Sequence, residues 1–147
     1  MGPERVAQVV EAIREFVPDV LVTHTGADPF NPDHPTAHQV VQRARSLAAG
    51  AGGPSAFASI PPPRLYLFEP HQPELCDFTP TTFLDITAVF EAKREAMAAM
   101  AAQGYLQTYY AQRAEQRANH ARRAGGNPGV RYAEAFQRVI PQVVEAL

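Results

Sequence analysis

The sequence lacks several features that define whole classes of protein. Among its 147 residues Cys76 is the only cysteine, which excludes an intramolecular disulfide and a thiolate metal cluster. No segment approaches the ~18 consecutive apolar residues that span a bilayer. The first residues, Met-Gly-Pro-Glu-Arg, form neither the basic nor the apolar region of a secretory signal. These absences predict a cytoplasmic protein that does not bind membranes.

The chain also lacks an excess of either charge. Its formal net charge is -2 and its pI is near 6.2, which argues against a protein that binds nucleic acid or an anionic membrane. Among 13 basic residues only Lys93 is a lysine. Genomic drift explains that bias most simply, although arginine also suits bidentate recognition of carboxylates. The length and a hydrophobic content of 46% fit one globular domain.

The N-terminal half shows clear hydrophobic periodicity. Apolar residues at helical spacing predict a first helix that Pro18 ends, with Arg14 outside the apolar stripe. The members of the stripe are Val6, Val9, Val10, Ile13, Phe16 and Val17. Val20–His24 reads as a strand buried on both faces, as in a parallel sheet. Pro35 then lies in the first turn of a second helix, which Gly50–Pro54 ends.

The C-terminal half predicts further elements of both kinds. In chain order they are a loop or crossover at 49–63, a strand at Arg64–Phe68, a short strand at Phe83–Ile86, one long helix from Thr87 to about Arg123, and a last helical segment around Tyr132–Leu147. The predicted buried side of the long helix carries Ile86, Phe90, Met97, Ala101 and Tyr105. About three strands result, whereas a doubly wound domain has five or six and begins with one. We expect an α/β, Rossmann-like three-layer fold with a mostly parallel sheet that lacks its N-terminal strand or strands.

Polar residues follow the first strand and lead into the second helix. Ligands bind at the carboxyl ends of strands in open α/β sheets, and this crevice would carry His24, Asp28, Asn31, Asp33 and His34. His34 is a suitable zinc ligand, and Asp33 could ligate or orient it. His38 lies one helical turn after His34, so both can face the same way. From spacing alone, solvated residues at a helix start explain the two histidines at least as well.

The remaining polar clusters admit simple explanations. His71 and Gln72, in the loop after the second predicted strand, could contact a carboxylate substrate or belong to a plain surface loop. The basic residues near the end of the long helix are explained by the helix dipole; they are Arg113, Arg117, His120, Arg122 and Arg123. Tyr105, Tyr109 and Tyr110 fit packing better than catalysis.

Two stretches resemble the LmbE/PIG-L family of zinc-dependent enzymes. Val17–His24 followed by Asn31–Ala37 is similar to the second signature region, in which a Pro-Asp-His at a helix start supplies a zinc ligand. Phe83–Thr87, with Lys93, resembles the Asp-Ile-Thr segment of the family. The resemblance implies that His34 binds Zn²⁺.

Further matches point to the hydratase branch of that family. They are Phe68–Glu74, Tyr109–Tyr110 and Tyr132–Arg138. The resemblance implies a lyase that adds water to 4-oxalomesaconate in the degradation of gallate and protocatechuate. Asn31 stands where the deacetylases of the family carry a histidine, and a neutral amide cannot shuttle protons. An N-acetylglucosaminyl deacetylase is therefore the second reading, and a non-catalytic fragment or assembly subunit the third.

One family signature is absent. The Ala-His-Pro-Asp-Asp segment, which the family uses for its other zinc ligands and its base, does not occur in this sequence. We therefore expect residues 1–147 to form the C-terminal portion of a single LmbE/PIG-L-like domain with an incomplete zinc site. The expected roles are catalysis for Asn31 and Asp33, substrate binding for His24, His71 and Gln72, and metal binding for His34. A small polyanionic carboxylate is the expected substrate, and a homo-oligomer the expected assembly.

Overall fold

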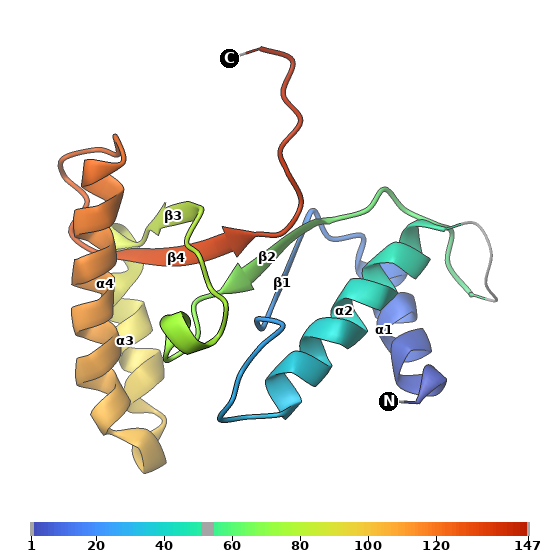
Figure 1. The fold of residues 1–147 in the computed structure, drawn as a ribbon, viewed down its shortest axis with the longest axis horizontal. Coiled ribbons are helices and arrows are strands. Elements are labelled where there is room, and N and C mark those ends of the chain that lie inside the picture. Colours follow the sequence, from blue (N-terminus) through green and yellow to red (C-terminus); the bar gives the residue numbers. More distant parts are fainter. Residues whose placement is uncertain (1, 51–54, 147) are drawn as a thin grey trace. The chain divides into compact units, whose positions relative to one another are not determined.

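The computed structural model describes residues 2–50 and 55–146 (Figure 1). Its helices and strands follow the order α-β-α-β-β-α-α-β, so the α/β class is confirmed. The chain divides into two compact units, Met1–Thr79 with Gln137–Leu147, and Pro80–Phe136. No helix within the described ranges is long and apolar enough to cross a membrane.

The first unit begins with a helix, a strand, a helix and a strand. These are α1 (Pro3–Phe16), β1 (Val20–Thr23), α2 (Asp33–Ala49) and β2 (Arg64–Phe68), followed by the 3-10 helix η1 (Pro73–Leu75). β1 and β2 pair in parallel, with Val20 opposite Arg64 and Thr23 opposite Leu67. All four elements lie close to their predicted positions. The predicted terminator of α2 falls partly at 51–54, outside the described residues.

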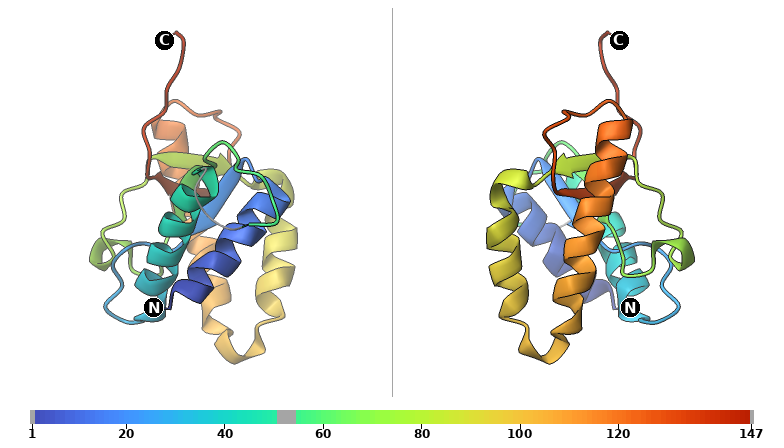
Figure 2. Two further views of the ribbon diagram at one scale, coloured as in Figure 1. Left: turned by 90° about the vertical axis from the view of Figure 1, so that its right-hand side faces the viewer. Right: turned by 90° about the vertical axis from the view of Figure 1, so that its left-hand side faces the viewer.

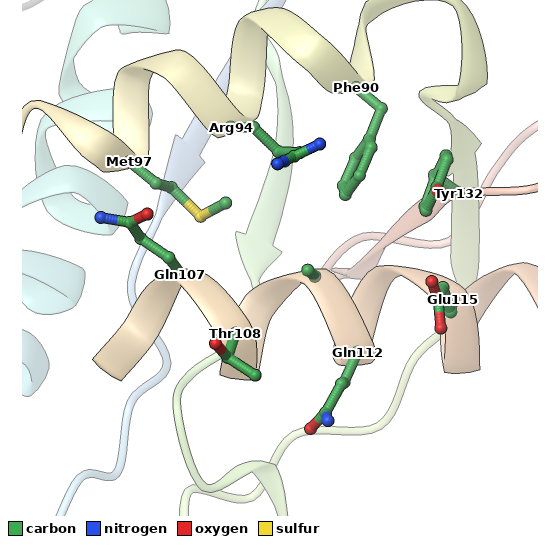
Figure 3. A pocket seen from close by; sticks show the side chains of 9 residues that line it. Phe90, Arg94, Met97, Gln107, Thr108, Gln112, Glu115 and Tyr132 are labelled. Carbon is green, nitrogen blue, oxygen red and sulfur yellow. The ribbon is translucent and has the colours of Figure 1, made fainter. Parts of the chain in front are cut away.

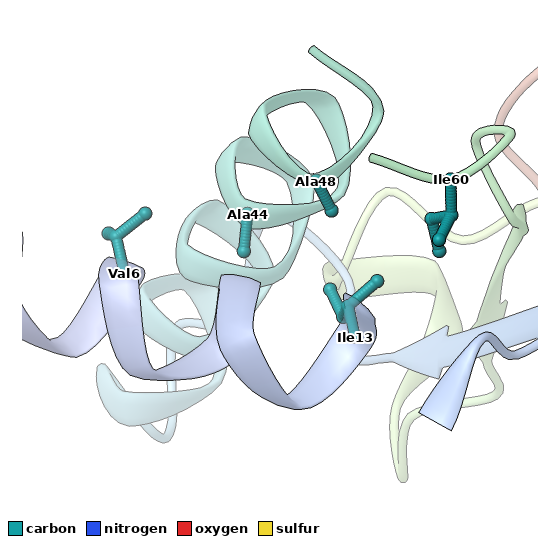
Figure 4. Packing of buried hydrophobic residues seen from close by; sticks show 5 residues of the cluster. All are labelled: Val6, Ile13, Ala44, Ala48 and Ile60. Atoms are coloured by element: carbon teal, nitrogen blue, oxygen red, sulfur yellow. The ribbon is translucent and has the colours of Figure 1, made fainter. Parts of the chain in front are cut away.

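Small residues let α1 and α2 pack closely. Ala44 and Ala48 on α2 are both 0% exposed, and Figure 4 shows Val6 and Ile13 of α1 pointing toward them. Ile60, from the segment before β2, completes this cluster. Because alanine keeps the helix backbones near each other, the larger side chains of α1 fill the space between them.

Arg14 lies inside this unit, and the expectation that it stays outside the apolar stripe is wrong. It is only 6% exposed. Its guanidinium donates to the carbonyl oxygens of Ala48 at 3.2 Å, Leu47 at 3.2 Å and Gly50 at 2.7 Å. A fourth bond, 3.3 Å long, reaches the carbonyl of Phe57. The last carbonyls of a helix lack partners within it, and a buried cation satisfies them where the helix dipole is negative.

β1 is not buried on both faces, contrary to the prediction. Thr23 is 4% exposed, whereas Val20 is 38% exposed and Val22 is 49% exposed. Leu21 packs against the α1–α2 cluster, so the helices cover only the face that Leu21 and Thr23 share. In the described chain the other face of β1, which carries Val20 and Val22, is exposed. An apolar run alone does not report how many faces of a strand are covered.

The second unit contains an antiparallel strand pair and a helical hairpin. β3 (Thr82–Asp85) and β4 (Ala133–Arg138) pair with Thr82 opposite Phe136 and Asp85 opposite Ala133. Between them lie the 3-10 helices η2 (Thr87–Val89) and η3 (Ala101–Gln103) and the helices α3 (Phe90–Ala98) and α4 (Tyr105–Arg123). β3 and β4 are thus antiparallel, whereas β1 and β2 are parallel, so a mostly parallel sheet is not confirmed.

The single long helix predicted from Thr87 to Arg123 is wrong, because the chain turns back between α3 and α4 (Figure 2). Ile86, Phe90 and Ala114 form one buried cluster, and the Phe90 ring stacks on Tyr132 with centroids 3.6 Å apart. A straight helix would separate Phe90 from Ala114 by about 36 Å, which forbids this contact. Gly104, a poor helix former, lies in the turn.

Of the residues predicted on the buried side of the long helix, those at its start are buried. Ile86 and Phe90 are buried, whereas Tyr105 is 71% exposed and Ala101 is also exposed. The two misassigned residues lie at the tip of the hairpin, where the reversal of the chain ends the stripe.

The last helical segment, predicted around Tyr132–Leu147, is also wrong. Ala133–Arg138 forms β4 and no helix follows it up to Ala146. Ala, Glu, Gln and Arg favour helices intrinsically. Here Ala133 and Ala135 are buried at alternating positions, and pairing with β3 determines the conformation. Tertiary context therefore outweighs local propensity in this segment.

Replacing Arg14 should destabilise the chain strongly. We expect Arg14→Ala to lower the free energy of unfolding by about 2–4 kcal/mol, because bonds to a charged donor are lost and buried carbonyls are left unsatisfied. Arg5→Ala is the matched control, since Arg5 is exposed on the same helix; it should change stability by less than about 0.5 kcal/mol. Urea denaturation measures both values, and equal effects of the two substitutions would contradict the capping role.

Candidate functional site

The loop between β1 and α2 is shaped by one carboxylate. Oδ1 of Asp28 accepts hydrogen bonds from the backbone N–H groups of Phe30 at 2.8 Å and Asn31 at 3.1 Å. Such bonds from an aspartate to the backbone two residues on form an Asx turn. The turn delivers the chain to the first residue of α2, Asp33, and brings the side chains of the loop toward the start of that helix.

The second oxygen of Asp28 holds His34. Oδ2 lies 2.7 Å from Nδ1 of His34, and the Asp28 side chain is 8% exposed. An ionised carboxylate only accepts hydrogen bonds, so Nδ1 of His34 carries the hydrogen. A carboxylate on one nitrogen fixes the ring and leaves the other nitrogen as the metal-binding atom in many metalloproteins.

Asn31 engages the other nitrogen of the same ring. Its Oδ1 accepts the backbone N–H of Asp33 at 3.0 Å, so its amide nitrogen faces His34, and Nδ2 lies 3.0 Å from Nε2. The amide nitrogen can only donate. Nε2 of His34 is therefore an acceptor, and the neutral ring with hydrogen on Nδ1 satisfies both neighbours.

His24 lies directly against His34. The two rings stack with centroids 3.8 Å apart and an interplanar angle of 14°, and Phe68 meets His24 edge-on at 4.5 Å. Burial lowers the pKa of His24, the neighbouring His34 lowers it further, and Asp28 acts in the opposite direction. The stack therefore favours a neutral His24, which can serve as a hydrogen-bond donor or acceptor for a substrate.

The same contacts keep Asp28 ionised. The backbone N–H of Phe30 is the main cause that lowers the pKa of its carboxyl, the hydrogen bond from His34 is the second, and Asn31 contributes as well. Burial opposes these effects but does not outweigh them. A carboxylate that accepts several hydrogen bonds favours its charged form.

His38 does not join His34, although the helical spacing allows both to face the same way. Its Nδ1 lies 2.8 Å from the backbone oxygen of His24, and its ring lies against Gly26, where an added Cβ would be 3.4 Å from Nε2. His38 thus fixes the end of β1 from within α2. It supports His24 and belongs to the scaffold of the site.

The other predicted site residues also belong to the first unit. Asp33 is exposed at the start of α2, His71 is exposed in the loop after β2, and Gln72 is half-buried just before η1. Their roles in catalysis and substrate binding stay predictions. The sequence suggested Asp33 as the residue that orients His34, whereas in the structure Asp28 holds the ring. The signal that could have found it is the Asp-Pro-x-Asn pattern of an Asx turn that ends three residues before His34.

The donor set fits one ligand of a zinc site and not a complete one. Nε2 of His34 presents a lone pair, and Asp28 supports the ring from behind. A catalytic zinc needs three protein ligands, and within residues 2–50 and 55–146 no group of three His, Cys, Asp or Glu is placed to hold a metal ion. A cation at Nε2 would also have to displace the amide of Asn31.

Sequence comparison finds relatives with two chemistries. No family model matches the chain. It is 40% identical over 143 residues to 4-oxalomesaconate hydratase of Pseudomonas putida, an alignment that covers 95% of this chain and 55% of the relative. It is 39% identical over 74 residues to 1D-myo-inositol 2-acetamido-2-deoxy-alpha-D-glucopyranoside deacetylase of Kineococcus radiotolerans, covering 49% of this chain and 20% of that protein. The chain thus spans about half the length of the hydratase.

Two solved structures are also similar to this chain. GalB, the 4-carboxy-2-hydroxymuconate hydratase from Pseudomonas putida, matches 100% of this chain and 62% of its own, with 37% identity and a TM-score of 0.94. A conserved protein of Thermus thermophilus matches 97% of this chain and 61% of its own, with 26% identity and a TM-score of 0.74. The resemblance to the LmbE/PIG-L enzymes noted in the motifs is confirmed by these relatives.

The titration of His24 tests the geometry of the site. We expect its imidazole to titrate below pH 6.5, and Asp28→Asn to lower its pKa further because Asp28 favours the imidazolium. With a lowered pKa, protonation of His24 costs more in the folded state. Its contribution to stability should therefore fall as pH drops from about 6.5 through the folded pKa. Histidine NMR titration measures the shift, with exposed Asp19→Asn as control. A higher His24 pKa in Asp28→Asn would refute the arrangement.

Proposed function

We propose that this chain, a homologue of 4-oxalomesaconate hydratase and of the LmbE/PIG-L deacetylases, functions in an enzyme that adds water to a carbon–carbon double bond. The observation that carries the proposal is the 40% identity to the hydratase over 95% of the chain. The match of the whole chain to the GalB structure supports it. Because the chain spans 55% of the first relative, the activity is proposed for the whole protein.

The substrate class follows from the names of the two hydratases. 4-Oxalomesaconate and 4-carboxy-2-hydroxymuconate are the keto and enol forms of one unsaturated tricarboxylate. Hydration breaks the π bond, adds hydroxyl to one of its carbons and adds hydrogen to the other, and it has no leaving group. We therefore infer a small tricarboxylate as substrate, in the degradation of aromatic compounds.

We infer a zinc ion as cofactor, with His34 as one of its ligands. Bound zinc would polarise a substrate oxygen or supply hydroxide. Asp28 would keep the His34 ring in the orientation that presents Nε2. The other protein ligands would come from outside the described residues, because within residues 2–50 and 55–146 no group of three His, Cys, Asp or Glu is placed to hold a metal ion.

The residues beside His34 would act on the substrate and the water. Asn31, once its amide leaves Nε2, would orient a water molecule or a substrate oxygen, and Asp33 at the same helix start would assist it. His24 would contact the substrate from its stacked position. His71 and Gln72 are proposed to bind a carboxylate from the loop after β2. A cytoplasmic location and a homo-oligomeric state remain sequence-based predictions.

Hydrolysis of an N-acetyl sugar amide is the second candidate, because half of the chain aligns with a deacetylase. Amide cleavage requires a proton for the departing amine. Asn31 has both ends of its amide engaged, with Asp33 and His34, and it cannot transfer protons. This observation favours hydration. A non-catalytic or assembly role is the third candidate and predicts neither activity.

The whole protein, purified with zinc, should consume 4-oxalomesaconate, and the loss of the substrate's absorbance measures the reaction. His34→Ala should reduce turnover by at least about 100-fold and abolish zinc binding at this site, because no other described side chain replaces Nε2. Release of acetate from an N-acetylglucosaminyl substrate, with no loss of 4-oxalomesaconate, would establish the deacetylase instead. Zinc bound with unchanged affinity in His34→Ala would refute the assignment of the ligand.

The support from Asp28 should be visible in metal affinity. We expect Asp28→Asn to weaken zinc binding by about 10–100-fold, the usual effect of removing the carboxylate behind a ligating histidine. Competition with a chromophoric chelator measures the affinity, with Asp19→Asn as control. Equal zinc affinity in the wild type and in Asp28→Asn would show that the carboxylate only shapes the loop.

A further inference from the structure

We propose that the α3–α4 hairpin of the second unit is an interaction surface for a second copy of this chain. The surface consists of a groove of about 350 Å³ between the two helices (Figure 3) and of the apolar tip of the hairpin. All of its residues belong to Pro80–Phe136. It gives the expected homo-oligomer a defined contact and does not depend on the proposed reaction.

The groove has an apolar floor and a charged rim. Phe90 and Met97 of α3 and Ala111 of α4 line it and are buried or half-buried, whereas Arg94 and Glu115 are exposed. An apolar centre inside a polar rim is the usual pattern of a protein–protein interface. Sites for small molecules bury most of their ligand, and a small ligand beside exposed charged residues would remain largely in water. The groove therefore suits a protein partner better than a small molecule.

The groove continues into an apolar run at the tip of the hairpin. Every residue from Ala96 to Ala102 is alanine or methionine. Met97 lines the groove, the others in the run are exposed, and Met100 is 57% exposed. A contiguous apolar surface in water marks a contact with another surface. Alanine also lets helices approach each other closely, so the tip can pack against helices of a partner.

Two opposite charges in the groove identify the partner. Arg94 comes from α3 and Glu115 from the facing helix α4 (Figure 3). Among the described residues the Glu115 carboxylate has no hydrogen-bond or ion-pair partner. Arg94 contacts Glu91, three residues before it, at 3.2 Å, and the two side chains are 59% and 75% exposed. Such an exposed pair contributes little, and other donors of the guanidinium remain open.

A groove with one positive and one negative wall is complementary to itself. A two-fold axis brings Arg94 of one copy to the partner's Glu115, and it brings Glu115 of the first copy to the partner's Arg94. Two helices from each copy then form a four-helix bundle, with the apolar floor and tip between them. A partner of one charge would match only one wall, so the paired charges favour a second copy.

Charge reversal tests the surface through the association of the whole protein, measured by sedimentation velocity. Arg94→Glu or Glu115→Arg should raise the dissociation constant of the two-fold contact by at least about tenfold, because each change places like charges together twice. The double variant restores opposite charges and should return the constant to within about threefold of the wild type. Glu95→Arg, an exposed residue of α3 outside the groove, should alter it by less than about twofold.

Three results would overturn the surface. They are a whole protein that stays monomeric at micromolar concentration, single variants that associate like the wild type, and a double variant that does not regain association. A monomer would mean that another segment of the whole protein, or a different partner, covers the groove. Circular dichroism verifies that each variant is folded. Hydration of 4-oxalomesaconate without this association contradicts the surface alone, and association without hydration contradicts the proposed function alone.

Discussion

The first unit depends on the hydrogen bonds that the guanidinium of Arg14 donates. They go to the carbonyl oxygens of Leu47, Ala48 and Gly50, which lack partners within α2, and they link the end of α2 to α1. The opposite end of α2 carries His34. A helix is stiff along its axis, so a contact at one terminus helps to fix the position of a ligand-type side chain at the other. The buried cation therefore connects the core of the unit with its candidate chemistry.

Asp28 serves the same purpose at the other end of α2, with two oxygens that have different partners. One oxygen forms the turn through Phe30 and Asn31, and the other holds the ring of His34. Because the turn and the histidine share one carboxylate, a change in the loop that moves Asp28 would also disturb its contact with His34. Local backbone structure and side-chain orientation are thus coupled through a single group.

Much of the first unit could be predicted from sequence, and much of the second could not. Local signals in the sequence predict α1, β1, α2 and β2. These signals are the hydrophobic periodicity, Pro18 and the β-branched run. The reversal between α3 and α4 and the strand character of Ala133–Arg138 come from contacts between distant residues, such as Phe90 with Tyr132. The site divides in the same way. His34 and Asn31 stand at a recognisable helix start, whereas the partnership of Asp28 with His34 requires the turn to be folded.

Asn31 joins the geometry of the site to the choice of reaction. Its amide nitrogen lies at Nε2 of His34, along the direction from which a metal ion would have to approach. Metal binding would thus release a donor beside the new metal site, while Oδ1 can remain on the N–H of Asp33. An amide can hold a substrate oxygen but cannot protonate a leaving amine. Hydration has no leaving group to protonate, although one carbon of the double bond still receives a proton. A histidine at this position could protonate a leaving amine, which hydration lacks, so the residue that weakens the deacetylase reading remains compatible with the addition of water.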